Sequence, residues 1–104
     1  MDTNDLSRET HIAIIDTAEG FHHDLTLQFG VLAEDCETDN EFLDEAETII
    51  KDWLTDWDLE ELIMDVFYDN PPGKKDFKKI LDKILSNIDN VRKIQMEQRK
   101  FDLW

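Results

Sequence analysis

The sequence is poor in residues that interrupt helices and in residues that cross-link chains. It contains three glycines, two prolines and one cysteine among 104 residues. A single cysteine excludes an internal disulfide, and so few helix breakers favour helices over a turn-rich β fold. The length fits one helical domain, residues 1–104, whose folding buries about 65% of the unfolded chain's surface.

Long apolar runs are also missing. The longest ones, such as 12–15, are far too short to cross a bilayer. The first five residues are polar or acidic apart from Met1, whereas a secretory signal peptide needs a basic start and an apolar stretch. Together with the single cysteine, these features predict a cytoplasmic protein.

Basic residues are scarce in the first two-thirds of the chain. Residues 1–70 contain 21 acidic and 2 basic side chains, a balance of −19. Residues 71–104 contain 5 acidic and 9 basic side chains, a balance of +4, and the whole chain carries −15. An acidic surface repels nucleic acid and anionic membranes and attracts a basic protein. Part of this charge has an internal explanation, because a basic last helix can pack against acidic helices.

Apolar residues recur with helical spacing, which predicts an all-α bundle of about four helices. The segments that show this spacing are 8–33, 39–57, 59–68 and 76–99. We expect a kink or break near Gly20 or Gly30, because glycine costs about 1 kcal/mol in a helix interior relative to alanine. An α+β alternative stays open, since residues 25–31 alternate apolar and polar as a short strand does.

Local signals sharpen several boundaries. Thr38 and Glu41 match a capping box at the start of the second helix, and Asp58 matches an N-cap for the third. The Pro/Gly segment 69–73 predicts a loop that separates the acidic helices from a basic C-terminal helix. Trp53 and Trp57 share the apolar stripe of 39–57, which places both in the core, whereas an exposed pair would mark a contact surface.

The last predicted helix is too long for the bundle. At 1.5 Å per residue it measures about 36 Å, against about 28 Å for the second helix, so it should project by a turn or more. The chain then ends in Phe101, Leu103 and Trp104. Large apolar residues at a terminus favour docking on this molecule or on a partner, and one such arrangement is a homodimer through the C-terminal helix.

Catalytic signatures are missing. The sequence has no Gly-rich phosphate loop, no nucleophile elbow and no CxxC pair. The acidic neighbours of Cys36 disfavour the reactive thiolate, which predicts a structural cysteine. The acidic run 34–47 lacks the glycine and the final glutamate of an EF-hand loop.

One pattern suggests a metal site. Glu19 and His22 form an E-x-x-H step, which in di-iron bundles places both ligands on one helical face, and His23 follows directly. Because a second such pair is missing, we favour a hydrogen-bonded His22 at the core edge, with His23 and Asp24 facing water. A metal-binding helical protein using Glu19, His22 and His23 remains the alternative.

These observations predict a non-catalytic interaction protein that needs no cofactor. We expect an adaptor, inhibitor or regulatory factor that presents an acidic helical face to a basic partner. The candidate partner-binding residues are acidic positions of the segment 34–65 and apolar positions of the tail: Glu34, Asp35, Glu37, Asp44, Glu45, Asp52, Asp56, Glu60, Phe101, Leu103 and Trp104.

Overall fold

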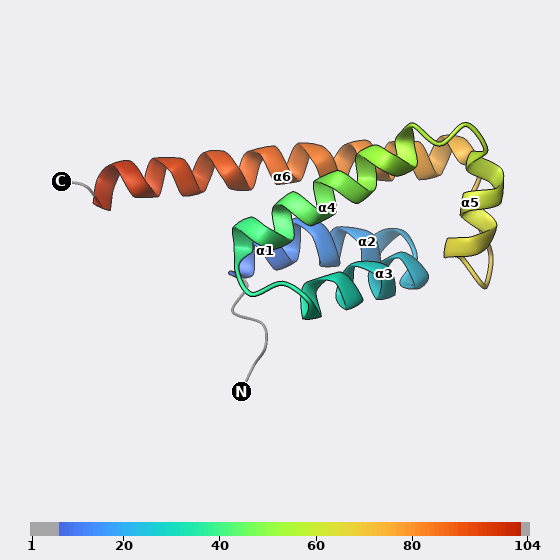
Figure 1. Cartoon of the computed structure of the whole chain (residues 1–104), viewed down its shortest axis with the longest axis horizontal. Coiled ribbons are helices and arrows are strands. Elements are labelled where there is room, and N and C mark those ends of the chain that lie inside the picture. The colour runs from blue at the N-terminus through green and yellow to red at the C-terminus, as the bar shows by residue number, and fades with distance from the viewer. Residues whose placement is uncertain (1–6, 103–104) are drawn as a thin grey trace.

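The computed structural model describes residues 7–102, with side chains described up to Met96. All regular structure in this range is helical, which confirms the predicted all-α class (Figure 1). The elements are α1 (Arg8–His11), the π-helix η1 (Ile12–Asp16), α2 (Thr17–Phe21), α3 (His23–Glu34), α4 (Asp39–Leu54), α5 (Leu59–Val66) and α6 (Lys74–Asp102). The strand alternative is wrong: residues 25–31 lie inside α3, which buries Leu25 and Phe29, four residues apart.

The first three elements form one continuous rod from Arg8 to Phe21, because the residues at their junctions keep right-handed helical angles. The chain then breaks at His22, where φ is −162° and ψ is 134°. The backbone N–H of Asp24 donates to Nδ1 of His22 at 3.1 Å, so His22 caps α3. The break predicted near Gly20 is thus confirmed, whereas Gly30 lies inside α3 without one.

The predicted caps are present, but one of the expected hydrogen bonds is made to a neighbouring residue. The N–H of Glu41 donates to Oγ1 of Thr38 at 3.1 Å, as a capping box requires. In the other direction, the Glu41 carboxylate accepts from the N–H of Glu37 at 3.3 Å rather than from that of Thr38. Asp58 caps α5 by accepting from the N–H of Glu61 at 3.3 Å. α4 ends at Leu54 and α5 at Val66, both a few residues earlier than predicted.

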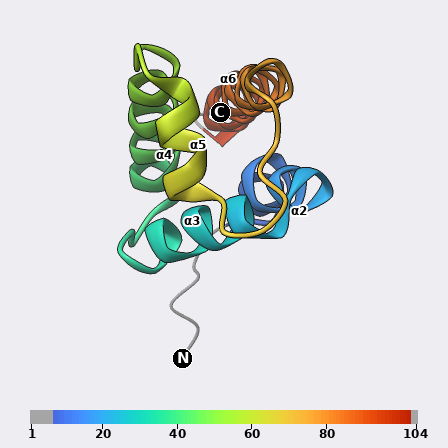
Figure 2. The same ribbon diagram turned by 90° about the vertical axis from the view of Figure 1, so that its right-hand side faces the viewer.

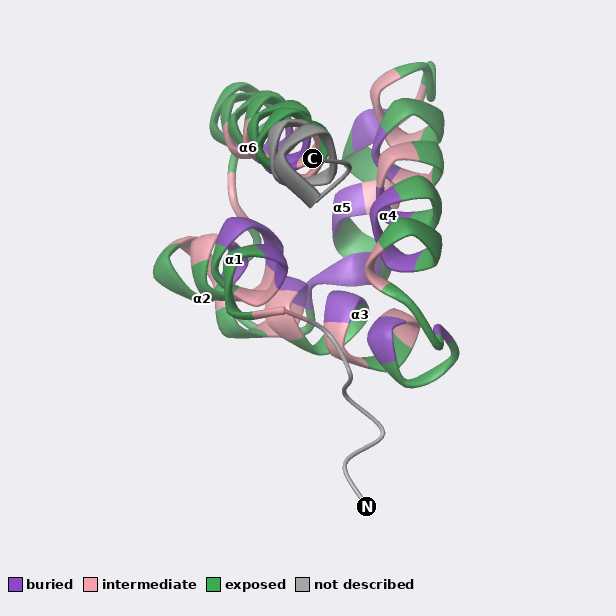
Figure 3. Cartoon of the chain, turned by 90° about the vertical axis from the view of Figure 1, so that its left-hand side faces the viewer, coloured by how far each residue is buried: buried purple, intermediate pink, exposed green. Residues whose placement is uncertain are grey.

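The long elements close into a ring around one core. α4 packs on α6, α6 on the Arg8–Phe21 rod, that rod on α3, and α3 on α4, while α5 lies across one end against α3, α4 and α6 (Figure 2). The buried faces of the helices point toward this interior (Figure 3). Its largest fully buried side chains come from every rod of the ring and include Ile14, Phe29, Phe42 and Phe77.

α6 is the basic helix, and it meets the acidic helices through ion pairs. Arg92 donates to Glu47 of α4 at 3.0 Å and also to Asp44, and the Lys74 ammonium lies 3.1 Å from the carboxylate of Glu60 on α5. These pairs stabilise the packing of α6 and neutralise part of the acidic charge. The loop 67–73 connects α5 to α6 and contains both prolines.

α6 also sets the outline of the molecule. Its 29 residues span about 44 Å, and its C-terminal turns extend past the other helices (Figure 1). The molecule measures 50 × 29 × 20 Å, with a radius of gyration of 14.5 Å against about 13 Å for a compact chain of this length. Within residues 7–102, no helix combines the length and the apolar character needed to cross a bilayer.

Candidate interaction surface

Trp57 is 95% exposed, which overturns the expectation that it lies in the core. The reason is local: α4 ends at Leu54, so the chain leaves the helix before Trp57 can continue its apolar stripe. Trp53, still inside α4, packs between the rings of Phe29 and Phe77, with centroid distances of 6.1 and 5.9 Å. The two tryptophans are therefore separated, one half-buried against the core and one in solvent.

Two further large apolar side chains lie exposed close to Trp57 in the chain. Met64, on α5, is 65% exposed, and Tyr68, just past the end of α5, is 83% exposed. α5 buries its other side through residues that include Leu59 and Ile63. All three belong to the twelve-residue segment 57–68, which contains α5 and the two residues on either side of it.

Carboxylates are interspersed with these apolar side chains along the sequence. We use the name α5 surface for Trp57, Met64 and Tyr68 together with the exposed acids Asp56, Glu60, Glu61 and Asp65. A hydrogen bond with the Asp58 carboxyl group, and then the negative charges of Asp58, Asp65 and Asp56, raise the pKa of Glu61. A raised carboxyl pKa indicates crowded negative charge, which a cationic group from outside would stabilise.

The predicted acidic candidates do not all meet at one place. Glu34, Asp35 and Glu37 are exposed at the corner between α3 and α4, about 24 Å of helix away from Asp56 and Glu60. Between these groups, Glu45 and Asp52 are exposed on α4, and Asp44 pairs with Arg92. Only Asp56 and Glu60 belong to the α5 surface. The candidate side chains of the tail, namely Phe101, Leu103 and Trp104, lie outside the described residues.

The apolar members of the α5 surface were not among the predicted candidates. A signal was present, because α5 and the residue after it contain Leu59, Leu62, Ile63, Met64, Val66 and Phe67, more apolar residues than one buried face requires. The sequence could not show which of them the core would leave outside. That depends on how α5 lies across the end of the ring.

The E-x-x-H face proposed for a metal does not form. Glu19 is exposed on α2, and the helix ends before His22. Since Nδ1 of His22 accepts from Asp24, the ring proton is on Nε2, which donates to the carbonyl oxygens of Asp69 at 2.7 Å and Asn70 at 3.1 Å. His23 is exposed, and within the described part of the chain no three His, Cys, Asp or Glu residues are grouped so as to hold a metal ion.

Asp24 has a structural role that the sequence did not indicate. Its carboxylate accepts from the N–H of Tyr68 at 2.9 Å and from that of Asp69 at 3.3 Å, so it does not simply face water as predicted. The Tyr68 hydrogen bond is the main cause that lowers the pKa of Asp24. Asp24 and His22 thus hold the segment 68–70, and with it one end of the α5 surface, against the start of α3.

Cys36 is buried in the turn between α3 and α4, with a free thiol. Burial raises the pKa of this thiol, and the nearby charges of Glu41, Glu45 and Asp35 raise it further. A raised pKa keeps the sulfur protonated and unreactive at neutral pH. This environment fits a structural cysteine and not a nucleophile.

Comparison of the chain with protein-family models, curated proteins and solved structures finds no match in any of the three.

Proposed function

We propose that this chain is a non-catalytic interaction protein that binds a basic partner protein through the α5 surface. Adaptors, inhibitors and regulatory factors all act by such binding. The single observation that carries the proposal is Trp57, a large apolar side chain that is 95% exposed among carboxylates. Tryptophan is enriched among the residues that dominate binding energy at protein interfaces, and so exposed a position gives it no comparable role in folding.

The chemistry of the surface defines the partner. Trp57, Met64 and Tyr68 offer apolar contact, and the surrounding carboxylates attract lysine or arginine side chains. We therefore expect the partner to present an apolar group flanked by positive charge. Nucleic acid and anionic membranes are not expected partners, because their own negative charge is repelled. The predicted homodimer through the C-terminal helix is a separate proposal.

The test is affinity capture on the immobilised chain from a lysate of its native host, followed by titration with the purified captured protein. Binding should be strong at about 50 mM salt and weak at about 500 mM, because salt screens exposed charges. Trp57→Ala should weaken binding by about 30-fold, which corresponds to the 2 kcal/mol typical of a dominant interface residue.

Val31→Ala is the matched control, since Val31 is an apolar residue 63% exposed on α3, away from the α5 surface. Both variants should keep the unfolding free energy within about 0.5 kcal/mol of the parent, as expected for exposed positions. Equal binding by the parent and Trp57→Ala, or binding that salt does not weaken, would contradict the proposal.

A further inference from the structure

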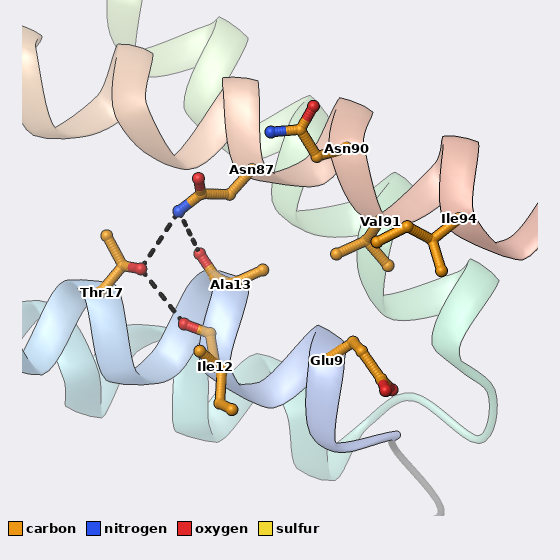
Figure 4. A pocket seen from close by; sticks show the side chains of 8 residues that line it. All are labelled: Glu9, Ile12, Ala13, Thr17, Asn87, Asn90, Val91 and Ile94. Atoms are coloured by element: carbon orange, nitrogen blue, oxygen red, sulfur yellow. Dashed lines mark hydrogen bonds between the residues drawn. The ribbon is translucent and has the colours of Figure 1, made fainter.

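An apolar groove runs between α6 and the rod that contains η1 (Figure 4). Its volume is about 320 Å³. Ala13 and Val91 are buried beneath it, while Ile12 and Ile94 remain 45% and 43% exposed at its sides. Two half-exposed isoleucines on neighbouring helices make this a surface on which further apolar area can be buried.

Asn87 closes one end of this groove. Its side-chain amide donates to the carbonyl of Ala13 at 3.0 Å and to Oγ1 of Thr17 at 3.1 Å (Figure 4). Thr17 in turn donates to the carbonyl of Ile12, five residues back, at 3.1 Å within the π-helical stretch. These bonds fix the distance between α6 and the rod here. At the other end lie Ile94 and the turns of α6 that extend past the bundle.

We propose that the groove binds a second copy of this chain in a two-fold symmetric homodimer, with the two α6 helices antiparallel and the axis near Ile94. Charge is the first reason. Among the described residues that line the groove, Glu9 alone is charged, whereas 15 of the 26 acidic residues fall within 23–66, the segment from α3 to α5. Two copies that each carry −15 repel least where their surfaces are nearly neutral.

A basic partner, by contrast, gains little from an apolar groove with one carboxylate. Because a basic partner favours the carboxylates of the α5 surface, the groove is left to a surface of nearly neutral charge. The projecting end of α6 in a second copy, residues 96–102, has two acidic and two basic side chains and is neutral overall, and a two-fold interface places it over the groove.

Length is the second reason. Gln95 donates to Asp39 of α4 at 3.3 Å, and seven more residues of α6, 96–102, extend beyond this contact. They span about 10 Å, and the groove from Ile94 back to Asn87 covers seven steps along the helix, which is also about 10 Å. In an antiparallel pair centred near Ile94, the projecting turns of each copy therefore cover the groove of the other.

The direct test is molar mass by light scattering, together with sedimentation equilibrium over a wide concentration range. The parent should form a dimer, and Ile94→Asp should raise its dissociation constant by at least about 30-fold, because the axis places two aspartates together in an apolar contact. Val31→Asp adds the same charge at an exposed valine outside the groove and should leave the dimer unchanged. Circular dichroism then checks that Ile94→Asp remains helical.

Cross-linking tests the antiparallel geometry. In a Cys36→Ser background, Ile94→Cys should form a disulfide-linked dimer on mild oxidation, since a residue at the axis meets its own copy. Val31→Cys should not. A parent that stays monomeric at all concentrations, or a dimer that Ile94→Asp leaves intact, would overturn the proposal.

Salt separates this proposal from the proposed function. Added salt screens the repulsion between two acidic copies, so it should tighten the homodimer. The same salt should weaken binding of a basic partner to the α5 surface. Either interaction can therefore fail without affecting the test of the other.

Discussion

His22 and Asp24 act at the scale of single residues, yet they join parts of the chain that are more than forty positions apart. His22 ends the first rod, caps α3 and donates to the carbonyls of Asp69 and Asn70. Asp24 accepts from the N–H groups of Tyr68 and Asp69. Without these two side chains, the backbone N–H and carbonyl groups of residues 68–70 would lose hydrogen-bond partners.

This arrangement predicts a pH dependence for the Asp24→Asn variant. The folded state lowers the pKa of Asp24 below its usual value of 3.8, chiefly through the Tyr68 hydrogen bond. A lowered carboxyl pKa stabilises the fold above about pH 4, and that contribution is lost as the pH falls through the folded-state pKa. Asp24→Asn should therefore be less stable than the parent at pH 7, and the difference should shrink below pH 4.

Urea unfolding of both proteins between about pH 7 and pH 3 measures this difference. Asp82→Asn, which removes an exposed carboxylate on α6, is the matched control and should show little change at either pH. A gap between Asp24→Asn and the parent that stays constant down to pH 3 would show that the carboxylate charge is not what holds the loop.

At the scale of the element, Gly30 weakens α3 without an evident structural need. It lies inside the helix, its φ is negative, and a β-carbon built on it meets no heavy atom within 4 Å. Gly30→Ala should therefore raise the free energy of unfolding by about 0.5–1 kcal/mol, because alanine loses less backbone entropy on folding. For a domain of this size, 1 kcal/mol corresponds to a rise of about 4–8 °C in Tm.

Thermal unfolding followed by circular dichroism gives this Tm directly. Gly20→Ala is the matched control: its β-carbon is equally unobstructed, but Gly20 lies in the last turn of α2, next to the break at His22. The rise in Tm should be smaller for Gly20→Ala, since the end of a helix frays and depends less on helix propensity than its interior does. A lower Tm for Gly30→Ala than for the parent would contradict the explanation.

The helices themselves could be predicted because their signals are local. The 3.6-residue spacing of apolar positions placed α4, α5 and α6 to within three residues at each end, and the caps at Thr38 and Asp58 are side chains that bond three residues ahead. The strand-like alternation at 25–31 does not produce a strand, because these residues are helical. In a helix, Leu25 and Phe29 fall on one face and both enter the core.

The candidate surface was harder to predict because it depends on distant contacts. Trp57 continues the apolar spacing of α4, so nothing within that segment shows that the helix stops at Leu54 and leaves it in solvent. Met64 is exposed because α5 crosses the end of the ring with its other side inward. The π-helical stretch at Ile12–Asp16 and the loop contacts of His22 likewise involve partners far along the chain.

At the scale of the whole molecule, repulsion and attraction between charges compete. The chain carries −15 in total, and 15 of its 26 acidic residues fall within 23–66, the segment from the start of α3 to the end of α5. Arg92 opposes this repulsion by joining α6 to Glu47 and Asp44 of α4, and the hydrogen bond from Arg92 is the main cause that lowers the pKa of Glu47. Because exposed ion pairs contribute little each, the excess of like charge should dominate.

The protein should therefore become more stable as salt is added. Between about 20 and 500 mM NaCl the Debye length falls from over 20 Å to under 5 Å, which screens repulsion across the acidic helices. We expect a gain on the order of 1 kcal/mol, comparable to the interaction of one close pair of charges in water. Urea is the suitable denaturant because it is uncharged, whereas guanidinium would itself screen the repulsion.

Arg92→Met separates the two contributions. It keeps much of the aliphatic length of the side chain and removes the attraction to Glu47 and Asp44, so at low salt it should be less stable than the parent. Since the parent's ion pairs also weaken with salt, the gap should narrow as salt rises, and the variant should gain more stability than the parent. The opposite result would be that salt lowers the free energy of unfolding of the parent. In that case, attraction between the basic helix α6 and the acidic helices contributes more to stability than the repulsion due to the net charge of −15 removes.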